Sequence, residues 1–128
     1  MRTPKHASNA TEAMILKSVL EYLQARRVLA FRMNSGTAML PGANHKHRPV
    51  RFGVPGMADV LAFPQVLITM NTATGPRKLA TPIPLWIECK SPVGVQSEVQ
   101  KSFQAQVEAE GHRYIIARNV DDVEEALR

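Results

Sequence analysis

The segment Pro84-Leu85-Trp86-Ile87-Glu88-Cys89-Lys90 is the part of the sequence on which the fold prediction depends. Its run of apolar residues predicts a strand. Successive side chains of a strand point to opposite faces of the sheet, so residues two apart share a face. One face is expected to carry Leu85, Ile87 and Cys89, and the other Trp86, Glu88 and Lys90. Glu88 and Lys90 are therefore predicted to lie together.

Asp59 introduces the strand that is expected to pair with this one. It follows shortly after the turn Gly53-Val54-Pro55-Gly56, and the sequence after it is strand-like as far as Ile68. Residues 72–82 contain Gly75-Pro76 and are predicted to be a hairpin connection. The two strands are therefore expected to be antiparallel neighbours, with the Asp59 carboxylate at a strand end from which it can reach a cleft.

The remaining sequence predicts three helices and two more strands. Apolar residues at helical spacing predict helices over residues 9–27 and 97–110, the second of which Gly111 ends. The other predicted elements are strands at 28–33 and 114–117, a short acidic helix at 121–127, and a long mobile loop, rich in Gly, Pro and His, at 34–56. The predicted order is helix, three strands, helix, strand, helix, which is an α/β protein.

The composition limits the class of protein. With 128 residues, 45% of them hydrophobic, residues 1–128 are expected to form one domain with its own core. Cys89 is the only cysteine, which excludes an internal disulfide and a zinc-finger ligand set. Charged residues interrupt the first 30 residues and no apolar run reaches about 18 residues, so neither a signal peptide nor a membrane span is expected. A soluble protein of a reducing cytoplasm is predicted.

The net charge of +5 is concentrated in one half of the chain. Residues 1–64 carry nine Lys and Arg against three acids, a balance of +6, whereas residues 65–128 carry seven against eight, a balance of −1. Basic and histidine side chains crowd together at Arg32, His45, Lys46, His47, Arg48 and Arg51. This density suits contacts with phosphates, and it equally suits a solvated loop. The histidines, including His112, have no fixed spacing that would favour a transition-metal site.

Asp59, Glu88 and Lys90 admit two interpretations. Carboxylate oxygens suit Mg²⁺ or Mn²⁺, and a lysine beside them can orient or deprotonate a water molecule. The alternative is a structural cross-strand ion pair at a partly exposed sheet end. The spacing of these residues alone leaves both interpretations open.

A wider set of motifs resembles a known nuclease family. In order along the chain these motifs are Gly56-Met57-Ala58-Asp59, Ile87-Glu88-Cys89-Lys90-Ser91-Pro92, Gly94, a helix with Gln100 and Phe103, and Gly111 before a strand. This order is similar to the VRR-NUC (virus-type replication-repair nuclease) domain of the PD-(D/E)xK superfamily, in its stand-alone phage form. Residues 31–36, Phe-Arg-Met-Asn-Ser-Gly, are also similar to a segment of small phage members.

The resemblance covers nearly the whole chain, with one departure in its first motif. The family often has proline immediately before the motif aspartate, where this chain has Ala58, and Pro55 lies four residues upstream of Asp59. A metal site needs the carboxylate and not the proline ring, so the departure does not affect the expected ligand. The implied fold is a restriction-endonuclease-like core, a mixed four-stranded sheet flanked by helices.

The resemblance implies a role for each residue of the central motif. Asp59 and Glu88 would be metal ligands, joined by the backbone carbonyl of Cys89, with Mg²⁺ or Mn²⁺ as the cofactor. Lys90 would hold the attacking water or stabilise the charge that builds on the phosphate. The Cys89 side chain is expected to face the core as a small buried hydrophobe.

Glu12 and Gln100 each have a structural and a catalytic interpretation. Glu12 stands three residues after Asn9, and Gln100 three residues after Ser97, so each matches the Glu or Gln of a helix capping box. The resemblance instead directs Gln100 toward Lys90 or the water, and Glu12 toward the metal through water or a second ion.

The implied activity is hydrolysis of DNA phosphodiesters by a metal-activated water, which leaves 5′-phosphate and 3′-hydroxyl ends. The sequence contains no helix of the kind that reads bases, so recognition of DNA shape is expected. Stand-alone members of the family resemble four-way (Holliday) junction resolvases that act as homodimers, and residues 72–82 are a candidate dimer contact. The implied setting is the cytoplasm of a bacterium or of a phage-infected cell.

A basic and polar set would hold the backbone of branched or double-stranded DNA, and its members are Arg32, Asn34, Ser35, Lys46, Arg48, Arg51 and Lys101. Two alternatives to a junction resolvase remain at this point. One is a flap- or nick-directed nuclease, and the other is a non-catalytic DNA-binding protein that keeps the nuclease fold.

Overall fold

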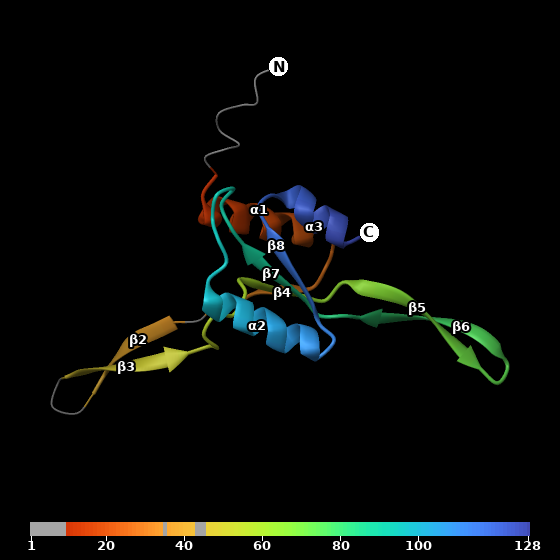
Figure 1. Ribbon diagram of the computed structural model, residues 1–128, viewed down its shortest axis with the longest axis horizontal. Helices are drawn as coiled ribbons and strands as arrows, with labels where there is room; N and C mark the ends of the chain where they lie inside the picture. Colours follow the sequence, from red (N-terminus) through yellow and green to blue (C-terminus); the bar gives the residue numbers. More distant parts are fainter. Residues whose placement is uncertain (1–9, 35, 43–45) are drawn as a thin grey trace, which may run out of the picture.

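A mixed four-stranded sheet lies between helices in the computed structural model, which describes residues 10–34, 36–42 and 46–128 (Figure 1). Its strands are β1 (Ala30–Arg32), β4 (Val60–Ala62), β7 (Leu85–Cys89) and β8 (Arg113–Ala117), in the order β1-β4-β7-β8. β4 pairs antiparallel with β1 and β7, and β8 runs parallel to β7. The predicted α/β class, the mixed sheet and the antiparallel neighbours are confirmed.

Helices cover both faces of this sheet and bury two groups of apolar side chains. α1 (Glu12–Ala25) and α3 (Val120–Ala126) pack on one face, over Leu85, Ile87 and Cys89 of β7. α2 (Glu98–Ala109) packs on the other face, over Trp86. β7 is therefore buried on both faces, which explains why its sequence, apart from Glu88, is apolar throughout instead of alternating.

The starts of α1 and α2 test the two predicted capping boxes. Ser97 and Gln100 form a complete capping box at α2, as predicted. At α1 the capping residue is Thr11, whose hydroxyl accepts a hydrogen bond from the Met14 N–H at 3.2 Å. The predicted cap, Asn9, lies outside the described residues. Because Glu12 is the first residue of the helix, its capping-box interpretation is wrong and its carboxylate is available for other contacts.

The long loop predicted over residues 34–56 is wrong for the part of this segment that the structure describes. β2 (Gly36–Pro41) and β3 (His47–Phe52) form an antiparallel two-stranded ribbon, here named the 36–52 ribbon. Pro41 and Pro49 obscure it in the sequence because proline cannot donate to a strand ladder. Their pairs, Pro41 with His47 and Met39 with Pro49, are two steps apart in the register, so both fall in the class that makes no inter-strand hydrogen bond.

The single strand predicted over residues 59–68 is also wrong, as is the connection predicted over 72–82. The chain breaks at Phe63-Pro64 after β4, and β5 (Gln65–Thr72) and β6 (Gly75–Pro82) form a second antiparallel ribbon, the 65–82 ribbon. The two ribbons project from opposite ends of the molecule (Figure 1). Without them, the element order is the predicted α-β-β-β-α-β-α. Among the described residues, no helix combines the length and apolarity that crossing a membrane requires.

Candidate active site

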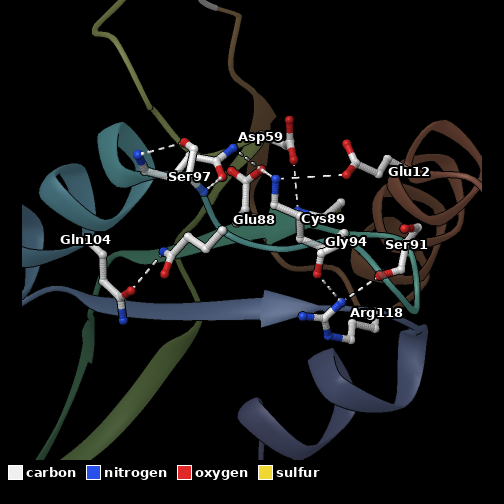
Figure 2. A network of polar contacts seen from close by, with 12 residues as sticks. Glu12, Asp59, Glu88, Cys89, Ser91, Gly94, Ser97, Gln104 and Arg118 are labelled. Carbon is white, nitrogen blue, oxygen red and sulfur yellow. Dashed lines mark hydrogen bonds and ion pairs between the residues drawn. The ribbon is translucent and has the colours of Figure 1, made fainter.

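Five predicted residues meet at the carboxyl end of β7, beside the N-termini of α1 and α2. Figure 2 labels three of them, Glu12, Asp59 and Glu88. Glu12 comes from the first turn of α1 and Gln100 from the first turn of α2, while Asp59 immediately precedes β4. Glu88 lies in β7 and Lys90 follows it. The structure therefore brings together, from four elements, the residues that the sequence motifs singled out.

Asp59 is fixed across the two central strands. Its Oδ2 accepts a hydrogen bond from the backbone N–H of Cys89 at 2.8 Å, and its carbonyl accepts one from the N–H of Met33 at 2.7 Å. The carboxylate is thereby held beside the backbone of Cys89, whose own carbonyl is the predicted third ligand. The Cys89 side chain is buried in the core, as predicted, and burial raises the pKa of its thiol to about 12, so the thiol stays neutral.

The turn before Asp59 packs against the backbone of α2. Gly56 has a φ of 76°, and a Cβ at this position would lie 2.3 Å from the carbonyl oxygen of Val99, a distance that no side chain can occupy. This contact joins the turn to the helical turn that carries Gln100. Glycine at position 56 therefore lets the Asp59 strand and the Gln100 helix approach each other at the site.

Glu88 is the buried centre of the group. It is 3% exposed, and its pKa rises from 4.5 to about 8, first because burial disfavours the charged form and next because of the negative charge of Asp59. Lys90 opposes this rise only in part. The charge of Lys90 alone therefore does not keep Glu88 ionised at neutral pH.

Lys90 lies between the carboxylates of Glu88 and Glu12. It is 8% exposed, and its Nζ lies 3.7 Å from Oε1 of Glu88 and 3.9 Å from Oε1 of the half-exposed Glu12. Lys90 therefore forms an ion pair with Glu88, which is the contact that the structural interpretation expects. Both distances exceed a direct hydrogen bond, so the ammonium group keeps donors for a water molecule or a phosphate oxygen.

Gln100 caps its helix, as one interpretation predicts, and it also reaches the site, where it contacts Glu88 instead of the predicted Lys90. Its Oε1 accepts a hydrogen bond from the N–H of Ser97 at 2.9 Å and completes the capping box, while its Nε2 donates to Oε1 of Glu88 at 3.0 Å. The helix cap thus holds the amide in the orientation in which it reaches the buried carboxylate. The Gln100 side chain therefore caps the helix with its oxygen and contacts the site with its nitrogen.

The donor set fits a hard divalent cation that retains water. Among the described residues, no three or more His, Cys, Asp or Glu side chains come close enough to form a metal cage. Mg²⁺ does not need such a cage, because it usually keeps several waters and binds through one or two carboxylates. Asp59, Glu88 and the Cys89 carbonyl supply that kind of set, and a cation there would neutralise the two carboxylates.

Among the described residues, no histidine belongs to the group. The Nδ1 of His112 accepts a hydrogen bond from the indole N–H of Trp86 at 3.0 Å, which gives this histidine a structural contact away from the carboxylates. His45 lies outside the described residues, and His47 is exposed on the 36–52 ribbon.

The predicted DNA-contacting residues do not form one patch. Arg32 and Asn34 are exposed at the end of β1, close to Asp59, whereas Lys46 and Arg48 lie toward the far end of the 36–52 ribbon. Lys101 is on α2 and forms an ion pair with Glu98 at 3.1 Å. Ser35 and the side chain of Arg51 lie outside what the structure describes. The set thus extends from the site along the ribbon.

One residue beside the site was not predicted. Arg118 donates hydrogen bonds to the carbonyls of Ser91 and Gly94, on the turn that follows Lys90. Arg118 follows β8, so α2 and β8 separate it from that turn in the sequence and no residue spacing links the two. Only the parallel pairing of β7 with β8 brings Arg118 beside the turn.

We expect Glu88 to make the metal-free protein less stable as the pH rises from 4.5 to 8. Between these values the unfolded chain has lost the Glu88 proton and the native protein still holds it, so the free energy of unfolding falls as pH rises. The slope from one group is at most about 1.4 kcal/mol per pH unit. Urea denaturation in EDTA across this range measures it. Glu88→Gln, which keeps an acceptor for Gln100, is expected to remove this part of the slope; an unchanged slope would contradict the assignment.

Comparison with known proteins returned no relative. No protein-family model matches this chain, nor does any curated protein or solved structure. The function is therefore argued from the chemistry of the site at the end of β7.

Proposed function

We propose that this protein is a Mg²⁺- or Mn²⁺-dependent endodeoxyribonuclease of the VRR-NUC type, with a restriction-endonuclease-like fold, that cuts branched DNA such as four-way junctions in the cytoplasm. The observation that carries the proposal is the burial of Glu88 beside Asp59, with the ammonium group of Lys90 3.7 Å from Glu88. Two carboxylates and a lysine at a strand end suit metal-assisted attack of water on a phosphodiester.

Each side chain has a defined part in this reaction. Asp59, Glu88 and the carbonyl of Cys89 would hold the cation, which when bound supplies Lewis-acid polarisation of the phosphate and a lowered pKa of water. Gln100 favours the ionised, ligating form of Glu88, because it donates a hydrogen bond to Oε1. Glu12 would accept hydrogen bonds from water on the side of Lys90 that faces solvent.

Lys90 supplies the positive charge that the protein itself contributes to the transition state. Its donors are directed neither into Glu88 nor into Glu12 at hydrogen-bond distance. They can therefore hold the attacking water or bind a phosphate oxygen as negative charge develops on it. A fixed donor in a buried site stabilises such charge without reorganising during the reaction.

Lys90→Ala is expected to lower the cleavage rate by about a hundredfold or more while DNA binding in EDTA persists, because a transition-state donor is lost. Synthetic four-way junction, flap and linear duplex, each with Mg²⁺ or EDTA, measure the activity. Lys17→Ala is the matched control, since Lys17 is exposed on α1 and away from the carboxylates. The control should cleave at the wild-type rate.

The same assay separates the alternatives. Absence of cleavage of every substrate by the unaltered protein would refute the nuclease proposal and leave a DNA-binding protein. Cleavage that survives Lys90→Ala would refute the mechanism. Preferred cleavage of flaps over junctions would favour the flap-directed nuclease.

The 36–52 ribbon is proposed to contact DNA next to the site. Residues 22–58 contain six Lys and Arg and no Asp or Glu, so this part of the chain attracts phosphates. The ribbon leaves the sheet beside Arg32 and returns just before Asp59, and its six-residue strands project by about 20 Å. A two-stranded ribbon also has the dimensions to enter the major groove of DNA.

The pair Lys46→Ala and Arg48→Ala is expected to weaken DNA binding and to leave the cleavage rate at saturating DNA unchanged. Loss of two phosphate contacts should reduce the slope of log affinity against log salt by about 1.8. Fluorescence anisotropy in EDTA at several salt concentrations measures this slope. The control is the pair Lys17→Ala and Lys78→Ala, which removes the same charge from exposed positions on α1 and on the opposite face of the 65–82 ribbon. Equal slopes for both double variants would contradict a role for the 36–52 ribbon.

We include a homodimer in the proposal, with the 65–82 ribbon as its contact. Ile68 pairs with Leu79 and Met70 with Arg77, so one face of the ribbon is largely apolar, and Leu79 and Met70 are exposed. A lone two-stranded ribbon is marginally stable in water, and exposed apolar patches often mark contact surfaces. A two-fold dimer would present two sites to one branched substrate.

Leu79→Asp is expected to convert the dimer to a 14.2 kDa monomer, because it puts a charge into the apolar face. Thr69→Asp is the control, since Thr69 points to the opposite face of the same ribbon. Sedimentation at several protein concentrations measures both. A monomer for the unaltered chain at all concentrations would refute the dimer and leave the nuclease proposal intact.

A further inference from the structure

The turn that follows Lys90 is held by one side chain from a distant part of the chain. In Ser91-Pro92-Val93-Gly94 the N–H of Gly94 donates to the carbonyl of Ser91 at 3.0 Å. Nη1 of Arg118 donates to the same carbonyl at 2.6 Å and to the carbonyl of Gly94 at 2.8 Å (Figure 2). The backbone N–H of Arg118 donates to Oδ2 of Asp122 at 2.8 Å, so the base of this side chain is fixed to α3.

The turn lacks an apolar anchor. Val93 is 86% exposed, Val95 is 79% exposed, and Pro92 is also exposed. Burial of apolar side chains is the usual means of fixing a loop, and these side chains do not supply it. The position of the turn therefore depends on its backbone hydrogen bonds, and two of these come from Arg118.

Gly94 transmits the position of the turn to the site. A Cβ on Gly94 would lie 3.3 Å from Oε1 of Glu12 and 3.4 Å from Cδ of Lys90. A side chain at position 94 would therefore meet both residues, so this part of the turn lies next to Glu12 and Lys90. A shift of the backbone at Gly94 would move the Lys90 side chain relative to the carboxylates.

We propose that Arg118 is a positioning residue for the reaction, an inference that rests on the proposed nuclease function. In this role Arg118 would act through the backbone of the turn and not on the phosphate or the cation. It fixes the turn at residues 91–94 and thereby sets where the Lys90 ammonium group stands. A displacement of about 1 Å in a reacting group can cost about a hundredfold in rate, so a clamp on the backbone has a kinetic consequence.

Arg118→Met removes the clamp and keeps much of the side-chain volume. We expect kcat to fall by about tenfold to a hundredfold, with the KM for DNA and the affinity in EDTA within about twofold of the wild-type values. Arg118→Lys restores a donor and should regain part of the rate. The matched control is Arg113→Met, because Arg113 clamps the carbonyl of Ala126 at 2.8 Å at the opposite end of β8. An unchanged kcat in Arg118→Met, or an equal loss in Arg113→Met, would overturn the proposal.

Gly94→Ala alters the same turn from a second position. The added methyl group would meet Ser91 Oγ at 3.1 Å as well as Glu12, while Arg118 stays in place. It should lower kcat, and the double variant with Arg118→Met should lose less than the product of the two single losses, because both act through one turn. Independent losses that multiply would contradict a shared route.

Hydrogen exchange at the Gly94 amide tests the clamp without any nuclease assay. Arg118→Met should speed exchange over residues 91–95 and leave β7 and β8 protected as in the unaltered protein. Unchanged exchange over the turn would overturn the inference even if the protein is a nuclease. Faster exchange in a protein that cleaves no DNA would refute the proposed function and leave the clamp established.

Discussion

The structure depends on one electrostatic constraint, the placement of two carboxylates together at the buried end of the central strand. The pairing of β4 with β7 brings Asp59 beside Glu88, and the hydrogen bond from the Cys89 N–H holds it there. Burial and mutual repulsion then raise the pKa of Glu88 to about 8. Lys90, Gln100 and the Gly56 contact with α2 all act on this pair: the lysine offsets its charge, the amide orients it, and the glycine permits the close approach.

The parts of the fold that the sequence predicted are those fixed by burial. β7, α2 and β8 carry apolar patterns that are buried only when helices cover the sheet. Ser97 and Gly111 mark the ends of α2 through local backbone chemistry that does not depend on tertiary contacts. The 36–52 ribbon was missed because the strand side chains that the structure describes are exposed and Pro41 and Pro49 interrupt its pattern. The 65–82 ribbon was missed because the strand-like pattern continues from Asp59 to Ile68 across the break at Phe63-Pro64, and Gly75-Pro76 also suits a connection between the central strands.

The site was predicted where its residues come from motifs and missed where they come from packing. Asp59, Glu88 and Lys90 follow from strand position and chemistry. For Gln100, the same residue type satisfies the helix cap and the carboxylate, so the sequence pattern cannot separate the two uses. The contacts of Arg118 depend on the parallel pairing of β7 and β8 and on the backbone of a turn, and neither leaves a signal in residue spacing.

A purely structural role for the group does not account for its composition. An ion pair of Glu88 with Lys90 needs one carboxylate, and a second one at Asp59 adds to the rise that burial already causes in the pKa of Glu88. Buried ionic groups are often replaceable by apolar residues without loss of stability, and departures from locally favourable choices concentrate at functional sites. On the proposed function, the second carboxylate is accounted for by a positive partner that the chain itself does not contain. A divalent cation, brought together with a phosphodiester, has the charge and the oxygen preference that Asp59, Glu88 and the Cys89 carbonyl would satisfy.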